Sequence, residues 1–121
     1  MITTTATILL VEDDPEQALL FGQALRRAGY TVVNAATAEE ALAKLASDAV
    51  TLLLVDWDLP GMNGDELITR VKGRFPILRT VLFSNHAHVD QAARASGADA
   101  WVRKIEGVNH LLGIIRAQLP P

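Results

Sequence analysis

The sequence contains no cysteine, and this absence excludes three kinds of chemistry. Without thiols the chain can form no disulfide framework, no thiolate metal site and no cysteine nucleophile. The composition therefore gives no sign of an oxidising compartment.

Long apolar runs are also missing. No apolar segment approaches the roughly 18 residues that a membrane-spanning helix needs, and the first residues, MITTTAT, contain no basic region. We therefore expect a cytoplasmic protein with no membrane partner.

Charge is neither high nor concentrated. The net charge is −3, and the 11 Lys and Arg residues are scattered along the chain. This distribution argues against direct contact with nucleic acid.

What the sequence does have is apolar material, because 50% of its 121 residues are hydrophobic. That is enough for one packed core, and we expect a single domain over residues 1–121.

Short apolar runs of strand length alternate five times with segments of helical spacing. The runs lie at residues 7–11, 31–35, 51–55, 80–83 and 100–103. The first, third and fourth are apolar without alternation, as strands covered on both faces are, whereas the other two carry polar residues. We expect the former in the middle of a sheet and the latter at its edges.

Helix signals fill the segments between the runs. Asp14-Pro15 is a cap followed by a suitable first helical residue, and Gly29 provides a stop. Apolar residues at spacings of three and four predict one helix between Asp14 and Gly29 and two more at 38–45 and 108–119. Residues 65–72 and the Ala-rich 89–96 predict two weaker helices, the second being the least firmly held.

Alternating strands and helices predict a parallel sheet with helices on both faces, joined by right-handed crossovers. Three buried strands between two edge strands fit the order 2-1-3-4-5, a flavodoxin-like doubly wound α/β fold with five helices. In this fold, ligands bind beyond the carboxyl ends of the first and third strands, where the winding reverses.

Acidic residues follow those two strands. Glu12, Asp13 and Asp14 come after the first, and Asp56 and Asp58 come at the end of the third. Neighbouring strands would bring these side chains into one crevice, where like charges recruit a cation. An all-oxygen set without His or Cys suits Mg²⁺ better than Zn²⁺.

The other strand ends complete a pocket for a dianion. Ser84 and Lys104 follow the fourth and fifth strands, so a hydroxyl and an ammonium face the acids. A carboxylate can itself be the nucleophile in phosphoryl transfer, and Asp56 is the natural one. The PG and NG dipeptides within residues 60–64 are turn signals that let backbone carbonyls point inward as further ligands.

Four stretches together carry a family resemblance: ILLVEDDP, LLLVDWDLPGMNG, VLFS and GADAWVRK. Each stands at the end of the corresponding strand and in the same order. The chain resembles the receiver domain of bacterial two-component response regulators over essentially its whole length.

The resemblance implies that a histidine kinase or phosphotransfer protein phosphorylates Asp56. The chain would be a phosphoacceptor that catalyses its own phosphorylation and dephosphorylation rather than an enzyme with a separate substrate. Ser84 and Lys104 would hold the phosphoryl group. Trp101 matches the switch aromatic, whose ring turns inward as Ser84 moves, and this would signal through the surface of helix four, strand five and helix five.

The resemblance also implies a Mg²⁺ site. Asp13, Asp56 and the backbone carbonyl of Asp58 would bind the ion, with Glu12 assisting through water. The sequence does not name the kinase or the output partner, and it leaves a homodimer open.

Two residues depart from the family's pattern beside the expected pocket. Ile105 follows Lys104 where the family usually has a cis proline, so we expect a trans peptide because a non-proline cis bond costs about 2.5–4 kcal/mol. Asn85 follows Ser84 where a small residue is common, and it could crowd the pocket or form a hydrogen bond across it.

Further departures concern helix four and the phosphoryl lifetime. The segment 84–104 is about two residues short, which should trim helix four or the loop before it. Asp58 and His86 stand at positions that tune how water reaches an acyl phosphate.

Two other functions stay open. A degenerate receiver would bind partners without phosphorylation, as the missing proline and Asn85 allow. A metal-dependent phosphohydrolase would use Asp56 as nucleophile and Asp58 as acid/base, but no cap segment for a small substrate is present.

Overall fold

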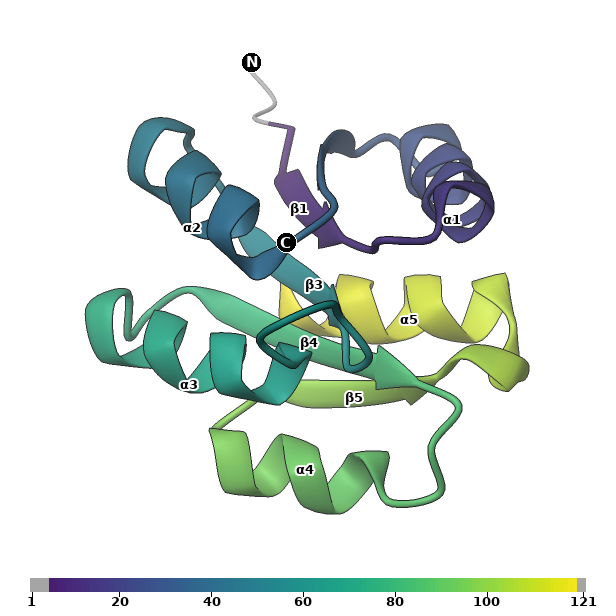
Figure 1. Ribbon diagram of the computed structural model, residues 1–121. Helices are drawn as coiled ribbons and strands as arrows, with labels where there is room; N and C mark the ends of the chain where they lie inside the picture. The colour runs from purple at the N-terminus through teal and green to yellow at the C-terminus, as the bar shows by residue number, and fades with distance from the viewer. Residues whose placement is uncertain (1–4, 120–121) are drawn as a thin grey trace.

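Five strands and five α-helices alternate along residues 5–119, the part of the chain that the computed structural model describes (Figure 1). The strands are β1 (Thr7–Val11), β2 (Thr31–Ala35), β3 (Leu52–Asp56), β4 (Arg79–Ser84) and β5 (Ala100–Arg103). The α-helices are α1 (Pro15–Arg27), α2 (Ala38–Ser47), α3 (Gly64–Arg74), α4 (Val89–Ser96) and α5 (Val108–Gln118), and a 3-10 turn, η1 (Lys104–Glu106), precedes α5.

The strands form one parallel sheet in the order β2-β1-β3-β4-β5, which confirms the predicted fold. All five residues of β3 are buried, whereas the edge strands β2 and β5 are partly exposed. The apolar runs therefore lie in the middle of the sheet, as predicted, because only central strands are covered on both faces.

Successive residues of each strand pack into different layers. Leu9 and Val11 of β1 join the apolar cluster under α2, α3 and α4, whereas Ile8 and Leu10 join the one under α1 and α5. Figure 1 shows these two helix layers on opposite sides of the sheet. The two-residue period of a strand thus divides the core between both faces.

The sequence-predicted start of α1 is confirmed in detail. Asp14 is extended, its Oδ1 accepts a hydrogen bond from the Glu16 N–H at 2.9 Å, and Pro15 is the first helical residue. Gly29, at φ +101°, reverses the chain just after the helix.

Within residues 5–119, no helix combines the length and apolar character needed to cross a bilayer.

Several boundaries differ from the sequence predictions. β3 starts at Leu52 and includes Asp56, and β4 extends to Ser84, because these ends still pair with neighbouring strands: Asp56 with Phe83, and Ser84 with Arg103. The expected turn dipeptide Asn63-Gly64 instead begins α3, with Asn63 as its cap. The two strand-end residues are consequently held by the sheet rather than by loops.

Asp99, just before β5, ties three elements together. Its carboxylate lies 2.7 Å from Lys72 Nζ and accepts a 2.8 Å hydrogen bond from the Thr80 N–H. Burial alone would raise the pKa of this carboxyl, but the bonds from Lys72 and Thr80 outweigh it and lower the pKa below its ordinary value. The ionised form therefore stabilises the fold.

We expect Asp99→Ala to lower the free energy of unfolding by about 2 kcal/mol at pH 7, since hydrogen bonds to a charged group are lost. Because the folded pKa is depressed, this stabilisation exists above the unfolded pKa and disappears as pH falls through the folded one. Urea unfolding at pH 7 and pH 3 measures both. Asp48→Ala, at an exposed acid, is the control, and an equal loss at both pH values would contradict the prediction.

Candidate functional site

Three carboxylates meet at the carboxyl ends of β1 and β3. Glu12 and Asp13 directly follow β1, and Asp56 ends β3, next to it in the sheet. One oxygen from each lies within 4.8 Å of the others. Glu12 and Asp56 are only 4% and 5% exposed, while Asp13 is exposed. Three of the five acids predicted to share a crevice therefore converge, and two of these three are desolvated. Of the other two, Asp14 caps α1 and the Asp58 side chain is exposed.

Lys104 reaches into this group from the end of β5. Its Nζ lies 2.8 Å from Glu12 Oε1 and 3.2 Å from Asp56 Oδ2, and it also donates to Gln17 Oε1. The ring of Phe83 lies under the ammonium, 4.7 Å from it, a favourable cation–π position. The strand ends thus place one mostly buried cation beside two buried acids.

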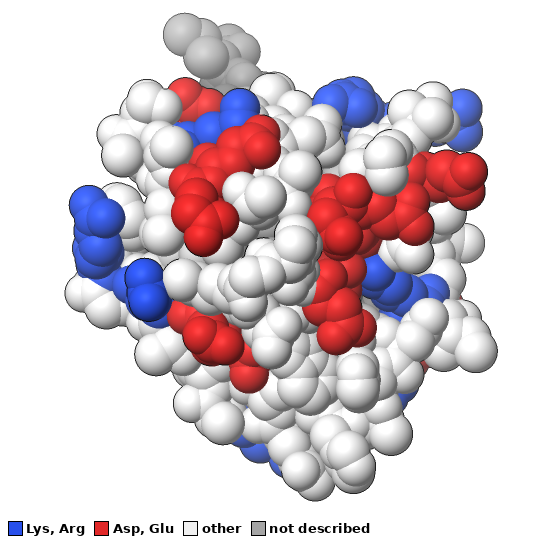
Figure 2. All heavy atoms as spheres, viewed as in Figure 1, with Lys and Arg blue, Asp and Glu red and all other residues white. Residues whose placement is uncertain are grey.

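The charge balance at this edge of the sheet favours a further cation. Three carboxylates face a single ammonium, and Figure 2 shows acidic side chains gathered in a band right of centre with a basic group beside it. Burial raises the pKa of Asp56 to about 7, a rise that Glu12 reinforces and Lys104 only partly offsets. A bound cation would favour the ionised form of Asp56.

Ser84 ends β4, the strand next to β3. It is 2% exposed, and its Oγ accepts a hydrogen bond from the His86 N–H at 3.1 Å. The sheet pairs Asp56 with Phe83, so Ser84 stands one residue further toward the carboxyl edge on the adjacent strand. Ser84 therefore ends its strand at the same edge of the sheet as Asp56, and its role at the acidic site stays a prediction.

Asp58 and His86 approach each other beside the site. The Asp58 N–H donates to Asp56 Oδ1 at 3.3 Å, and the Asp58 carboxylate lies 3.8 Å from His86 Nε2. The His86 ring also packs on Trp57, with centroids 4.7 Å apart. Both sequence-predicted modulators are thus exposed, and the packing of His86 on Trp57 is a contact that the sequence did not indicate.

The peptide between Lys104 and Ile105 is trans, as predicted, for no cis bond occurs in residues 5–119. Lys104 begins the turn η1, and its ammonium still reaches Asp56. Of the two roles considered for Asn85, the hydrogen bond is the one found: its Oδ1 accepts from the Ile105 N–H at 2.7 Å. Both departures from the family's pattern therefore take part in one contact.

Trp101 lies on β5, away from the acids. Its ring is partly buried and packs against the α2–α4 side of the sheet, with the Arg94 guanidinium 5.2 Å from its centroid. The Trp101 ring thus connects β5 to α4 through its contact with Arg94. Its role as a switch residue stays a prediction.

Sequence reasoning missed three further residues that shape the site. Gln17 and Phe83 surround Lys104, and Gly64 packs against the Asp56 backbone. Gln17 follows the Asp14 cap by three residues, so its place near the strand ends could have been inferred from the helix start. Nothing in the local sequence distinguishes Phe83 from an ordinary core residue.

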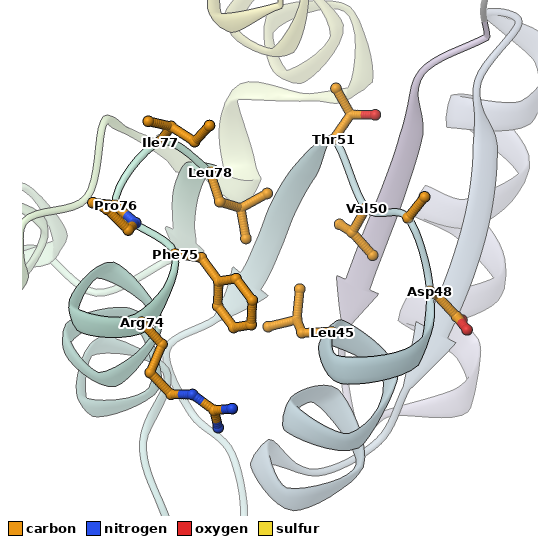
Figure 3. Close-up of a pocket in the computed structure, with 10 residues that line it drawn as sticks. Leu45, Asp48, Val50, Thr51, Arg74, Phe75, Pro76, Ile77 and Leu78 are labelled. Carbon is orange, nitrogen blue, oxygen red and sulfur yellow. The ribbon is translucent and has the colours of Figure 1, made fainter.

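An apolar hollow lies at the opposite end of the sheet (Figure 3). Leu45 and Phe75 point toward each other inside it, and the loops before β3 and β4 form its walls. Its lining includes Asp48 and Arg74 but none of the acids at the carboxyl ends of the strands. This hollow is separate from the candidate site.

Comparison with known proteins agrees with this geometry. Residues 8–116 match the family model of the response regulator receiver domain. The chain is 35% identical over 104 residues to the response regulator protein FleR of Pseudomonas aeruginosa, covering 84% of this chain and 22% of that protein. It is 30% identical over 116 residues to the phosphate regulon transcriptional regulatory protein PhoB of Rhizobium meliloti, covering 93% and 51%.

Solved structures show the same fold. A CheY-like receiver domain protein from Methanospirillum hungatei superposes with a TM-score of 0.88 at 32% identity, over 95% of this chain and 94% of that one. The chemotaxis response regulator CheY4 of Vibrio cholerae gives 0.88 at 27% identity, over 96% and 100%. The chain spans about a fifth to a half of the length of the curated relatives named here. With its acids, hydroxyl and lysine at the expected strand ends, the chain belongs to the response regulator receiver domain family.

Proposed function

We propose that this chain is a phosphorylation-controlled switch whose phosphoacceptor is Asp56. A carboxylate oxygen of Asp56 attacks the phosphorus of a phosphohistidine on a sensor kinase or phosphotransfer protein. The bond from phosphorus to the histidine nitrogen breaks, the imidazole leaves, and an acyl phosphate forms on Asp56. The observation that carries this proposal is the Lys104 ammonium, 3.2 Å from the buried Asp56 carboxylate.

Lys104 suits the electrostatic part of this reaction. Phosphoryl transfer spreads negative charge over the equatorial phosphoryl oxygens, and a pre-placed ammonium stabilises that charge without reorganising. Contacts to Glu12 and Gln17 and the Phe83 ring hold the ammonium in position. We propose that the chain promotes its own phosphorylation, and the later hydrolysis, through this side chain and the metal site.

We propose a Mg²⁺ site formed by Asp13, Asp56 and the backbone carbonyl of Asp58. The donors are all oxygen, which suits this ion, and Asp13 and Asp56 supply two of the three converging carboxylates. Glu12 Oε1 is already paired with Lys104, which supports a role for Glu12 through water rather than as a direct ligand. When bound, Mg²⁺ would neutralise charge on the phosphoryl group.

We propose that Ser84 binds the phosphoryl group once it forms. Its Oγ accepts one hydrogen bond and donates none to residues 5–119, so the hydroxyl proton is available to a phosphoryl oxygen. Ser84 ends β4, beside β5 and its Trp101, and this adjacency supports output through the α4, β5 and α5 surface. The output partner would be a protein of the cytoplasm that binds this surface.

Incubation with acetyl phosphate and Mg²⁺, followed by intact-mass and peptide analysis, tests the proposal. One phosphoryl group should appear on Asp56 and be absent from Asp56→Asn. Asp48→Asn, at the far end of the sheet, should still be labelled. Labelling at another residue, or undiminished labelling of Asp56→Asn, would contradict the proposal. Partner binding without labelling would indicate a phosphorylation-independent module, and turnover of a generic phosphate ester would indicate a phosphohydrolase.

A further inference from the structure

A side chain continues the β4–β5 pairing beyond the end of the sheet. The backbone register of these strands stops at Ser84 and Arg103, after which β4 leads into a loop and β5 into η1. Immediately beyond this pair, Asn85 Oδ1 accepts the Ile105 N–H at 2.7 Å. The amide side chain thus supplies one more link where the two backbones have separated.

The two ends of this link adjoin the two residues proposed to hold the phosphoryl group. Asn85 follows Ser84, and Ile105 follows Lys104. The link needs a backbone N–H at position 105, which a proline would not have. The non-proline residue at 105 and the amide side chain at 85 are therefore donor and acceptor of one hydrogen bond.

Apart from the Lys104 side chain, whose ammonium contacts Asp56 and the Phe83 ring, the bond to Asn85 is the one hydrogen bond within residues 5–119 that ties η1 to the loop after β4. The Ile105 side chain is 83% exposed, so burial does not anchor the turn. Within η1, the Glu106 carboxylate accepts from the Arg103 N–H, and the Gly107 N–H bonds to the Lys104 carbonyl. These bonds shape the turn without attaching it to β4. Outside η1, Nη2 of Arg103, the last residue of β5, donates to the Ala87 carbonyl at 3.1 Å, in the loop between β4 and α4.

We propose that Asn85 is a positioning residue for the phosphoacceptor site, acting through the Ile105 N–H to hold Lys104 against Asp56. The side chain sets the spacing between the ends of β4 and β5, and therefore between Ser84 and Lys104. This inference rests on the proposed function, because it assigns the residue a role in phosphorylation of Asp56.

The test is a double-mutant cycle with acetyl phosphate as donor and Mg²⁺ present. Asn85→Ala should lower the maximal phosphorylation rate about three- to tenfold, the effect of one hydrogen bond, with little change in the KM for acetyl phosphate. In an Ile105→Pro background, where the donor is already gone, the same change should cost less than about twofold. Asn109→Ala, an exposed amide on α5, should leave the rate unchanged.

Hydrogen exchange of the Ile105 amide provides a readout that is independent of activity. Exchange should be faster in Asn85→Ala and stay protected in Asn85→Asp, which keeps an acceptor oxygen. An equal loss of rate in both backgrounds, no loss in either, or an Ile105 amide as protected in Asn85→Ala as in the parent chain would overturn the inference. If the parent chain takes no phosphoryl group on Asp56, the proposed function itself is overturned. That result differs from the outcomes above, in all of which the parent chain is phosphorylated.

Discussion

Asp56→Asn is expected to abolish phosphorylation and, at the same time, to raise the free energy of unfolding by about 2 kcal/mol at pH 8. The two effects have one origin. The carboxylate that would accept the phosphoryl group is 5% exposed, and burial raises its pKa from 3.8 to about 7. At pH 8 the parent chain keeps a buried charge that the amide does not carry. Lys104 retains its partner Glu12 in the variant, so no cation is left unpaired.

The pH dependence follows from the direction of this shift. Between the unfolded pKa near 3.8 and the folded pKa of about 7, the folded chain holds a proton on Asp56 that the unfolded chain releases. Stability of the parent chain therefore falls as pH rises through this window. The gain in unfolding free energy from Asp56→Asn should be smaller at pH 5 than at pH 8. Mg²⁺ should reduce this gain by stabilising the ionised carboxylate of the parent chain.

Urea unfolding of both chains at pH 5 and pH 8, with and without Mg²⁺, measures these differences. Asp48→Asn is the matched control, an exposed acid at the far end of the sheet. If Asp56→Asn proved less stable than its parent at pH 8, the carboxylate would be a net stabilising group, and the raised pKa would be wrong.

Gly64→Ala should lower the free energy of unfolding by about 3 kcal/mol, a large effect for one methyl group. Gly64 is the first residue of α3, and its N–H donates to the Trp57 carbonyl at 2.8 Å. A Cβ there would lie 2.1 Å from the Asp56 carbonyl oxygen and 3.1 Å from Trp57 Cα. Because both contacts are backbone atoms, either α3 or the end of β3 must shift.

The same helix offers a control variant with the opposite expected effect on the free energy of unfolding. A methyl group at Gly73 would meet no neighbouring side chain or loop of residues 5–119 within 4 Å, so Gly73→Ala should raise stability by about 0.5–1 kcal/mol through helix propensity. Thermal unfolding of the two variants against the parent separates steric clash from propensity. The Asp56 phosphorylation rate should fall in Gly64→Ala only. Equal stability of the two variants would show that the approach of α3 to Asp56 is not tight.

The sequence was sufficient to predict the sheet order and the convergence of acids. Both follow from short-range patterns, namely apolar runs such as LLLV and carboxylates placed where these runs end. A parallel sheet brings equivalent ends to one edge, so Asp13, Asp56 and Lys104 could be placed together without coordinates. The residue types then restricted the chemistry to oxygen ligands and an ammonium.

Contacts between segments distant in sequence could not be predicted in the same way. The strands extend to Asp56 and Ser84 because of pairing with neighbours, which a single run does not reveal. Asn85 could be identified as unusual, but its partner lies 20 residues away and depends on where β5 ends. Gly64 read as a turn residue because its proximity to Asp56 arises only when α3 folds back onto β3.

Lys104 joins the Asp56 carboxylate to the first helix of the chain. The same ammonium that faces Asp56 binds Glu12, at the end of β1, and Gln17, in the first turn of α1. We expect a group that draws this ammonium further toward Asp56 to weaken its bond to Gln17 in α1. By thermodynamic reciprocity, we expect a protein that binds α1 and displaces Gln17 to change the rate of the proposed phosphorylation of Asp56.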